Sequence, residues 1–362
     1  MEWSRASLAL AVSLAAMAPS SVSFKASPAP DTAQAADASA AVAAACAAAE
    51  NPVAGSRKIP DLVAMLSDDR RVENTACASE RWGNWFGADP VVCLTTPAQE
   101  AARALAKVGA AAVGPLVAAL GNPGSVVRRH AAIALGMSED RPAKATAQSG
   151  LVKTLGDSEW DVRRAAVWAL GERGDATAIE PVSKRLADAH PRVRATAAHA
   201  LGELDDVRAV DALMGALSDS DVEVRTMAAW ALGEIEQPRS VPALVKALSD
   251  ADHRPREKAV WALGEIGSAD GVAGLTRALK DEHPRVREMA AWALGEIGSP
   301  TAIDGLIAAL RDEVSGVRAK AAWALGEIAD RRAAEALTAS MKDPHPSVRK
   351  MAAWALAETL GH

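Results

Sequence analysis

Apolar positions recur in this chain with two superimposed periods, that of an α-helix and a longer one equal to the step from Trp261 to Trp292. On a helix that turns about 100° per residue, one set of apolar residues falls in a single stripe: Val286, Ala290, Ala293, Leu294 and Ile297. A second apolar run, with steps of three and four residues, follows over residues 301–310. Because this pair of runs returns at the longer interval, the pattern predicts a repeat protein of two-helix units, each burying its apolar face on the next.

A tryptophan occupies the same position in most of these units. The position is filled by Trp168, Trp230, Trp261, Trp292, Trp323 and Trp354, with His199 between the first two. On its helix, Trp292 lies about 210° from the centre of the apolar stripe, so we expect the indole to point away from its own unit's core. Gly295 stands inside the same helix, where glycine costs about 1 kcal/mol against alanine. Its recurrence predicts the close approach of a neighbouring backbone.

Charged and turn-forming residues keep the same interval at the ends of the predicted helices. An aspartate such as Asp281 precedes each Val-Arg pair, here Val286-Arg287, and its side chain is suited to cap a helix start. We expect the Asp and Arg ladders, for example Asp281 with Arg287, to connect neighbouring turns. The sequence Gly298-Ser299-Pro300 predicts a left-handed helix end followed by a restart.

The phrase Val-Arg-x-x-Ala-Ala-x-Ala-Leu-Gly-Glu-Ile-Gly resembles the short HEAT-like repeats of the phycobilisome-lyase type, over residues 97–360. In this the chain is similar to secreted bacterial HEAT repeat proteins. The resemblance implies that the second helix of each unit lines a concave surface and that the tryptophan position faces ligands. Solenoids of this kind host many unrelated functions, so the resemblance bears on the fold more than on the function.

These patterns predict an all-α fold, a right-handed α-solenoid of about nine stacked two-helix HEAT-like repeats over residues 58–362. The second helix of the first unit is delayed until Thr96-Pro97-Ala98-Gln99, a capping sequence with proline at the first helical position. Residues 69–95 are therefore predicted to be an insertion, which is longer than a connection needs.

The N-terminal residues have a different composition. An apolar run over residues 6–18 predicts a signal peptide or an uncleaved N-terminal anchor within residues 1–26. Residues 27–57 are rich in alanine and proline and predict a linker, followed by either a capping helix or a frayed tail. We therefore expect an exported protein, periplasmic or extracellular, that touches a membrane only through an uncleaved N-terminal segment.

The insertion carries two of the three cysteines. In an exported protein, a disulfide between Cys77 and Cys93 would close the insertion and leave Cys46 free. Unpaired cysteines are the alternative. No CxxC pair with a nearby histidine supplies four zinc ligands, so we expect no metal site there.

Composition narrows the choice of partners. Apolar residues make up 49% of the chain but aromatic residues only 3%, and alanine fills the predicted interior, which suits closely stacked helices. The net charge is −6, with 40 basic and 46 acidic residues interspersed, and no basic stripe indicates nucleic acid as the partner.

Two enzyme families built from similar repeats give the alternative function. Deoxyhypusine hydroxylases bind two irons through His-Glu pairs, whereas here His130 and His199 are followed by alanine. Phycobilin lyases act largely as chromophore chaperones, and no residue in this chain marks a bilin site. The sequence also has no phosphate-binding glycine loop and no nucleophile elbow. We therefore expect no enzyme activity and no cofactor.

The candidate functional surface is the tryptophan column itself. Glutamates four residues after the tryptophans and methionines three residues before them lie on nearby faces of the helix: Glu234, Glu265, Glu296, Glu327, Met227 and Met289. Aromatic rings flanked by carboxylates suit an extended peptide or protein segment with basic or proline-rich side chains. The sequence thus predicts a protein-interaction scaffold. The alternative is that each indole lies flat across the neighbouring repeat and only stabilises stacking.

Overall fold

The computed structural model describes residues 58–69, 72–73, 94–138 and 144–361, and these residues are almost entirely helical. The segments expected over residues 1–26 and 27–57 lie outside the described residues, as do Cys46, Cys77 and Cys93. In the described ranges, no helix combines the length and the apolar character that crossing a bilayer requires.

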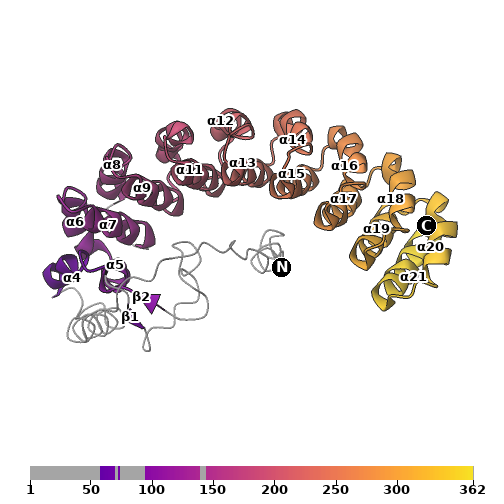
Figure 1. Ribbon diagram of the computed structural model, residues 1–362, viewed down its shortest axis with the longest axis horizontal. Helices are drawn as coiled ribbons and strands as arrows, with labels where there is room; N and C mark the ends of the chain where they lie inside the picture. Colours follow the sequence, from indigo (N-terminus) through magenta and orange to yellow (C-terminus); the bar gives the residue numbers. More distant parts are fainter. Residues whose placement is uncertain (1–57, 70–71, 74–93, 139–143, 362) are drawn as a thin grey trace.

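The described α-helices pair into nine hairpins that stack side by side into an arc (Figure 1). The second helix of each hairpin lies on the inner, concave side of the arc: α5 (Pro97–Val108), α7 (Ser125–Met137), α9 (Trp160–Glu172), α11 (Pro191–Glu203), α13 (Val222–Ile235), α15 (His253–Ile266), α17 (Pro284–Ile297), α19 (Ser315–Ile328) and α21 (Pro346–Gly361). The first helix lies on the outer side: α4 (Ile59–Met65), α6 (Ala110–Ala119), α8 (Lys144–Thr154), α10 (Ile179–Ser183), α12 (Val210–Ala216), α14 (Val241–Ala247), α16 (Val272–Ala278), α18 (Ile303–Ala309) and α20 (Ala334–Ser340). The predicted α-solenoid is confirmed.

Short 3-10 turns flank the outer helices of the regular units. Six of them lead into an outer helix and one, η2, follows α10: η1 (Ala176–Ala178), η2 (Lys184–Ala187), η3 (Val207–Ala209), η4 (Pro238–Ser240), η5 (Ala269–Gly271), η6 (Pro300–Ala302) and η7 (Arg331–Ala333). From α9 to α19, each inner helix is therefore followed by a short turn that returns the chain to the outer layer.

The start of α5 follows the predicted capping sequence. The Thr96 hydroxyl accepts a hydrogen bond from the Gln99 amide at 3.1 Å, and the Gln99 side chain accepts one from the Thr96 amide at 3.1 Å. Just before it, β2 (Leu94–Thr95) pairs antiparallel with β1 (Val72–Glu73). Val72 lies opposite Thr95, and Glu73 lies opposite Leu94.

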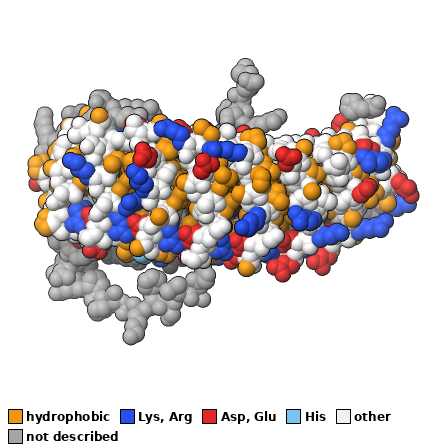
Figure 2. All heavy atoms as spheres, turned by 90° about the horizontal axis from the view of Figure 1, so that it is seen from above, with side chains coloured by type: hydrophobic (Ala, Val, Ile, Leu, Met, Phe, Trp, Pro, Cys, Tyr) orange, Lys and Arg blue, Asp and Glu red, His pale blue; other side chains and the backbone are white. Residues whose placement is uncertain are grey.

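Seen from its outer side, the solenoid carries a mixed charge pattern. Lysine and arginine side chains alternate with aspartate and glutamate along the whole length of this face (Figure 2). The outer face therefore offers no continuous surface of one sign to a charged polymer.

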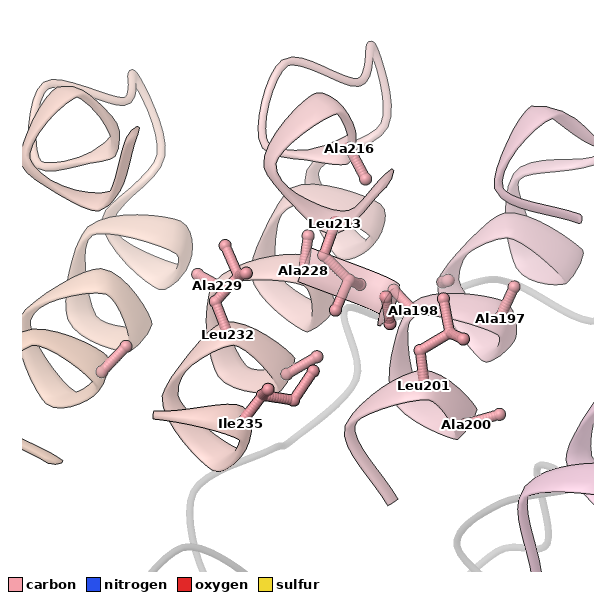
Figure 3. Packing of buried hydrophobic residues seen from close by; sticks show 14 of the residues in the cluster. Ala197, Ala198, Ala200, Leu201, Leu213, Ala216, Ala228, Ala229, Leu232 and Ile235 are labelled. Atoms are coloured by element: carbon pink, nitrogen blue, oxygen red, sulfur yellow. The ribbon is translucent and has the colours of Figure 1, made fainter. Parts of the chain in front are cut away.

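Alanine and leucine fill the space between the layers. Leu213 of α12 and Leu201 and Leu232 of the inner helices are fully buried at 0% exposure, and they meet between the hairpins (Figure 3). Each such leucine stabilises the fold by about 1.5 to 3 kcal/mol. Ala200 and Ala231, 2% and 0% exposed, lie against Gly171 and Gly202 of the preceding inner helices. Their small side chains allow those helices to pack closely, as predicted.

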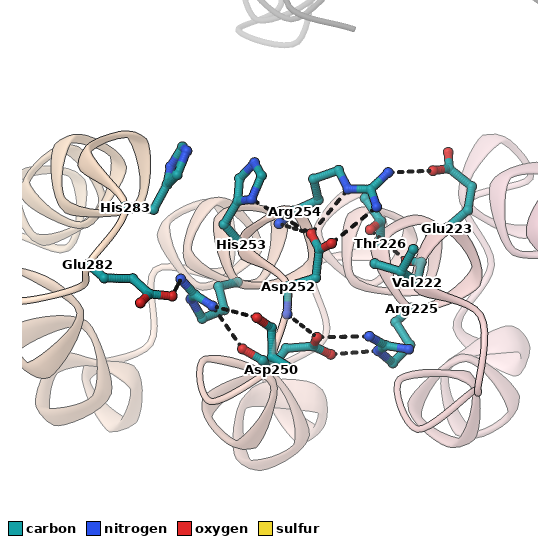
Figure 4. Close-up of polar contacts among 12 residues, drawn as sticks. Val222, Glu223, Arg225, Thr226, Asp250, Asp252, His253, Arg254, Glu282 and His283 are labelled. Atoms are coloured by element: carbon teal, nitrogen blue, oxygen red, sulfur yellow. Dashed lines mark hydrogen bonds and ion pairs between the residues drawn. The ribbon is translucent and has the colours of Figure 1, made fainter. Parts of the chain in front are cut away.

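Arginine–aspartate pairs connect each hairpin to the next. Arg225 donates from Nε and Nη2 to the two carboxylate oxygens of Asp250 at 2.6 and 2.9 Å (Figure 4). Its Nη1 donates to the carbonyls of Asp219 and Ser220 in its own hairpin, at 2.9 and 3.2 Å. The same arrangement recurs in Arg128–Asp157, Arg163–Asp188, Arg194–Asp219, Arg256–Asp281, Arg287–Asp312 and Arg318–Asp343. These bidentate contacts fix both the spacing and the orientation of neighbouring units.

The pairing predicted for Asp281 and Arg287 needs correction. Arg287 contacts only the backbone carbonyl of Asp281, at 2.9 Å, and its carboxylate partner is Asp312 of the following unit. The Asp281 carboxylate binds Arg256 of the preceding unit. The bidentate pair therefore joins residues 25 apart in adjacent units, whereas the six-residue step within one unit favoured the near pair.

The recurring aspartate is also not the residue that caps the helix. Asp250 accepts a hydrogen bond from the Asp252 amide at 3.0 Å, and Asp252 is the N-cap of α15. Burial by itself raises the pKa of Asp250, but the hydrogen bonds from Arg225 and from the Asp252 amide outweigh it, and the pKa is lowered. The carboxylate is therefore held ionised at the joint between two units.

The inner helices of the regular units end in left-handed residues. Gly298 has φ of 68°, which confirms the predicted turn. The equivalent position holds a non-glycine residue in three other units, with φ of 44° at Asp205, 52° at Glu236 and 53° at Ala329. These three positions carry local backbone strain that glycine would avoid.

Candidate functional site

The indoles lie on the inner helices, from α9 to α21. Trp230, Trp261, Trp292 and Trp323 are half-buried and Trp354 is 36% exposed. Trp230, Trp261, Trp292 and Trp323 also pack against the buried core, so the position of the indole outside the core of its own hairpin stays a prediction from helix geometry. Trp168 differs, because only 4% of it is exposed and it offers almost no area to a partner.

Each indole also packs on the glycine of the preceding inner helix. A Cβ atom added to Gly264 would lie 2.7 Å from Cζ3 of Trp292, and one added to Gly233 would lie 2.5 Å from Cζ3 of Trp261. The same relation holds for Gly136, Gly202, Gly295 and Gly326 with Trp168, Trp230, Trp323 and Trp354. One edge of the ring therefore stabilises stacking, as in the alternative drawn from the sequence. Trp230, Trp261, Trp292 and Trp323 are only half-buried, so these contacts leave part of each residue exposed.

A row of glutamates runs beside the column, one helical turn after each indole. The indole N–H groups of Trp230 and Trp261 donate to the carboxylates of Glu234 and Glu265. Burial raises the pKa of Glu234, and the charges of the neighbouring Glu203 and Glu265 raise it further. Burial likewise raises the pKa of Glu265, with added effects of Glu236 and Glu296. The carboxylates thus interact from one unit to the next along the row.

Methionine and lysine alternate on the other side of the column, three residues before each tryptophan. Met227, Met289 and Met351 are half-buried. In the units between them, the Lys258 ammonium lies 5.9 Å from the Trp261 ring centroid and that of Lys320 lies 4.9 Å from Trp323. Sequence reasoning found the methionines but missed these lysines, although the repeat interval places both residue types in one position.

His199 interrupts the column. Its imidazole stacks on Trp230 with ring centroids 4.6 Å apart and an interplanar angle of 14°, and its Nε2 lies 3.7 Å from Glu203. Burial lowers the pKa of His199 to about 4, so the ring is neutral at physiological pH. The continuous run of accessible indoles therefore begins after this residue.

The turns at the start of the inner helices carry stacked rings. His253 and His283 stack with centroids 3.9 Å apart, and Trp160 stacks on His190 at the same distance (Figure 4 for the first pair). Arg164 also lies 5.5 Å from the Trp160 centroid. These histidines lie in turns, as expected, but their partners are aromatic rings of the adjacent unit. The stacking of rings from adjacent units could have been inferred from the sequence, because the two residues of each pair are separated by almost one full repeat.

Within the described part of the chain, no group of three or more His, Cys, Asp or Glu side chains is arranged to hold a metal ion. The titratable residues form rows along the arc rather than converging in a pocket.

The sequence matches a family model of HEAT repeats in four overlapping stretches, over residues 148–221, 179–258, 241–325 and 303–361. A search among curated proteins found no match. One similar chain comes from the structure of the complex of CpcE and CpcF of phycocyanin lyase from Nostoc sp. PCC7120. The two sequences are 27% identical, the match covers 59% of this chain and 88% of that chain, and the TM-score is 0.40.

Two further structures share the fold. The Escherichia coli protein YibA is 17% identical, with 79% of this chain and 98% of that chain covered and a TM-score of 0.53. A chain from the structure of Kap95p with RanGDP is 17% identical, with 73% and 42% covered and a TM-score of 0.55. This architecture is typical of protein-interaction scaffolds.

Proposed function

Since this chain belongs to the HEAT repeat family, we propose that it is a protein-interaction scaffold that binds an extended segment of a partner on its concave face. The main support is the run of accessible indoles from Trp230 to Trp354, one in each inner helix. Aromatic side chains at the centre of a surface contribute most of the binding free energy in many interfaces.

The half-buried state of these rings favours binding. Because one edge of Trp261 is fixed against Gly233, little side-chain entropy remains to be lost when a partner covers the other part of the ring. Met227 and Met289 lie beside the column and supply adaptable apolar area around the rigid rings. We propose that Trp168 takes no direct part, because it is buried.

We propose binding rather than catalysis as the activity. In support, the inner helices from α13 to α21 repeat the same few types of side chain, whereas a catalytic site needs different titratable groups converging on one point.

The test is site-specific photo-crosslinking of the full chain. A photoreactive residue at Met289 should crosslink a partner from the native source, and one at the outer residue Val207, which is 48% exposed, should not. The double variant Trp261→Ala/Trp292→Ala should lose the crosslink from Met289 while retaining its helical circular dichroism. Crosslinks of equal yield from both faces, or crosslinks that survive the loss of both indoles, would refute the proposal.

A further inference from the structure

The concave face presents one aromatic ring and one carboxylate per unit, and this regularity constrains the backbone of whatever binds there. The inference rests on the proposed function. It concerns the five successive inner helices from α13 to α21, which carry Trp230 to Trp354 and Glu234 to Glu358. A partner that uses every unit must offer equivalent groups at the spacing of these helices.

That spacing is short. A Cβ atom on Gly264 would lie 3.1 Å from Cα of Ala293 in the next inner helix, so the two backbones approach as closely as glycine allows. Helices in such contact have axes about 8 to 10 Å apart, at the lower end when the contact residues are small. The indole and carboxylate positions therefore recur at about 8 to 10 Å along the groove.

Two extended backbone conformations can be compared with this interval. In a β-strand the residues of one face are two apart, which is about 7 Å, and residues three apart point to opposite faces. A polyproline II helix has three residues per turn and rises about 3.1 Å per residue, so residues i, i+3 and i+6 share one face about 9 Å apart. Only the polyproline II conformation places one residue on each unit without a change of face.

The carboxylates specify the charge of the residues that face them. Among the described residues, no ion pair within 4.0 Å joins Glu234, Glu265 or Glu296 to a basic side chain, although the charge of Glu234 acts on the Lys258 ammonium from further away. Burial raises the pKa of Glu234 and of Glu265, and like charges raise each further: those of Glu203 and Glu265 act on Glu234, and those of Glu236 and Glu296 act on Glu265. A row of like charges of this kind is relieved by cations placed at the same interval.

The aromatic rings indicate which residues lie between the basic side chains of the bound segment. Aromatic-lined grooves bind polyproline II segments because these segments are already extended and lose little entropy on binding. The indoles of Trp261 and Trp292 are held at one edge by glycine contacts, so their accessible surfaces form fixed platforms for proline rings.

We propose that the occupant of the concave face is a polyproline II segment of a partner protein that carries one basic side chain in each three-residue turn. The basic side chains contact the glutamate row, and the prolines between them pack on the indoles. A segment with one turn on each of the five helices from α13 to α21 has five turns of three residues, which is about 15 residues.

The experiment measures binding of labelled peptides of about 15 residues to the full chain by fluorescence anisotropy and by quenching of tryptophan emission. The probes are five repeats of Pro-Pro-Lys, a permuted peptide of the same composition in which the lysines are unevenly spaced, and five repeats of Pro-Pro-Glu. The first should bind at least about tenfold more tightly than either of the others.

Two triple variants separate position from charge. Glu234→Gln/Glu265→Gln/Glu296→Gln should abolish the preference for the regular lysine peptide. Glu180→Gln/Asp304→Asn/Glu335→Gln removes the same charge from exposed residues of the outer helices and should leave the preference unchanged.

Equal affinity for the regular and permuted peptides, or a preference that survives in the first triple variant, would overturn this inference. If that binding still disappears in Trp261→Ala/Trp292→Ala, the proposed function stands without it. If no peptide binds while the crosslink from Met289 remains dependent on the indoles, the polyproline II occupant is wrong and the scaffold is retained. Binding that ignores both the glutamates and the indoles contradicts both proposals.

Discussion

Adding one methyl group to the inner helix α15 tests the account of how the units stack. In Gly264→Ala, the new Cβ would lie 2.7 Å from Cζ3 of Trp292 and 3.0 and 3.1 Å from Cβ and Cα of Ala293. The indole edge can shift, but Ala293 belongs to the backbone of α17 and can yield only if the two units separate. The substitution therefore acts on the interface between repeats and not on the helix itself.

The magnitude follows from two opposing effects. Replacing glycine by alanine inside a helix stabilises it by about 1 kcal/mol. Overpacking a well-packed contact costs about 1 to 3 kcal/mol, and the upper part of this range applies because backbone atoms form part of the obstacle. We expect Gly264→Ala to lower the free energy of unfolding by about 1 to 2 kcal/mol.

Gly215→Ala is the matched control. Gly215 lies in the outer helix α12, and nothing lies within 4 Å of the position its Cβ would occupy. The same chemical change should therefore stabilise the protein by about 0.5 to 1 kcal/mol. Urea unfolding monitored by circular dichroism at 222 nm measures both variants, and the two shifts should have opposite signs.

A second comparison isolates the indole. In a Trp292→Ala background the nearest obstacle is gone, so Gly264→Ala should cost about 1 kcal/mol less than it does in the original chain. Additive effects of the two substitutions, or a Gly264→Ala variant that is stabilised as much as Gly215→Ala, would refute the contact as the reason for the recurring glycine.

Four further predictions concern the Arg225–Asp250 pair, the buried His199 and the left-handed residue Ala329. Arg225→Ala leaves the Asp250 carboxylate without its bidentate partner and should lower the free energy of unfolding by about 2 to 3 kcal/mol, measured by urea unfolding. The control Arg349→Ala removes only hydrogen bonds to backbone carbonyls and should lower it by less than about 1 kcal/mol. Equal losses in the two variants would contradict a stabilising role for the Arg225–Asp250 pair. Because the pKa of Asp250 is lowered in the folded state, its carboxylate stabilises the fold above about pH 4, and this stabilisation is lost as the pH falls further. In Arg225→Ala, the free energy of unfolding should therefore depend less on pH in the acid range. An unchanged dependence would count against the pairing. Burial lowers the pKa of His199 to about 4 in the folded state, so the neutral ring contributes fully to stability above about pH 6.5, and this contribution is lost progressively down to pH 4. His199→Trp should remove on the order of 2 kcal/mol of this pH dependence of the free energy of unfolding. Parallel pH profiles of stability for the two proteins would refute this effect of burial. Ala329→Gly relieves a φ of 53° and should raise the free energy of unfolding by about 0.5 to 1 kcal/mol, whereas a destabilised variant would show that the turn is not strained.

Much of the fold was predictable from local patterns. The stripe through Val286, Ala290 and Leu294 is buried as expected, because a helix of fixed pitch places these residues on one face whatever surrounds it. The capping sequence at Thr96 and the left-handed turn at Gly298 were predictable for a similar reason, since both depend on a few adjacent residues.

The candidate site was predictable only in part. The position of Trp292 outside the core of its own hairpin follows from helix geometry, but the surface covered by its other edge does not. That edge packs on Gly264 of the preceding unit, and this contact depends on how far one hairpin is shifted against the next. The burial of Trp168 was likewise not evident, because its position in the repeat is the same as that of the accessible indoles.

The sequence by itself determined the unit, its two helices, the turns between them and the face on which each indole stands, because these depend on helical periodicity and on residues close together in the chain. Only the tertiary structure decided which units share a contact, such as Arg225 with Asp250, and how much of each indole remains accessible. The physical reason is that the offset between hairpins is set by the combined packing of alanine, glycine and tryptophan over two units. This combined packing involves residues of two units, so no single stretch of the sequence determines it.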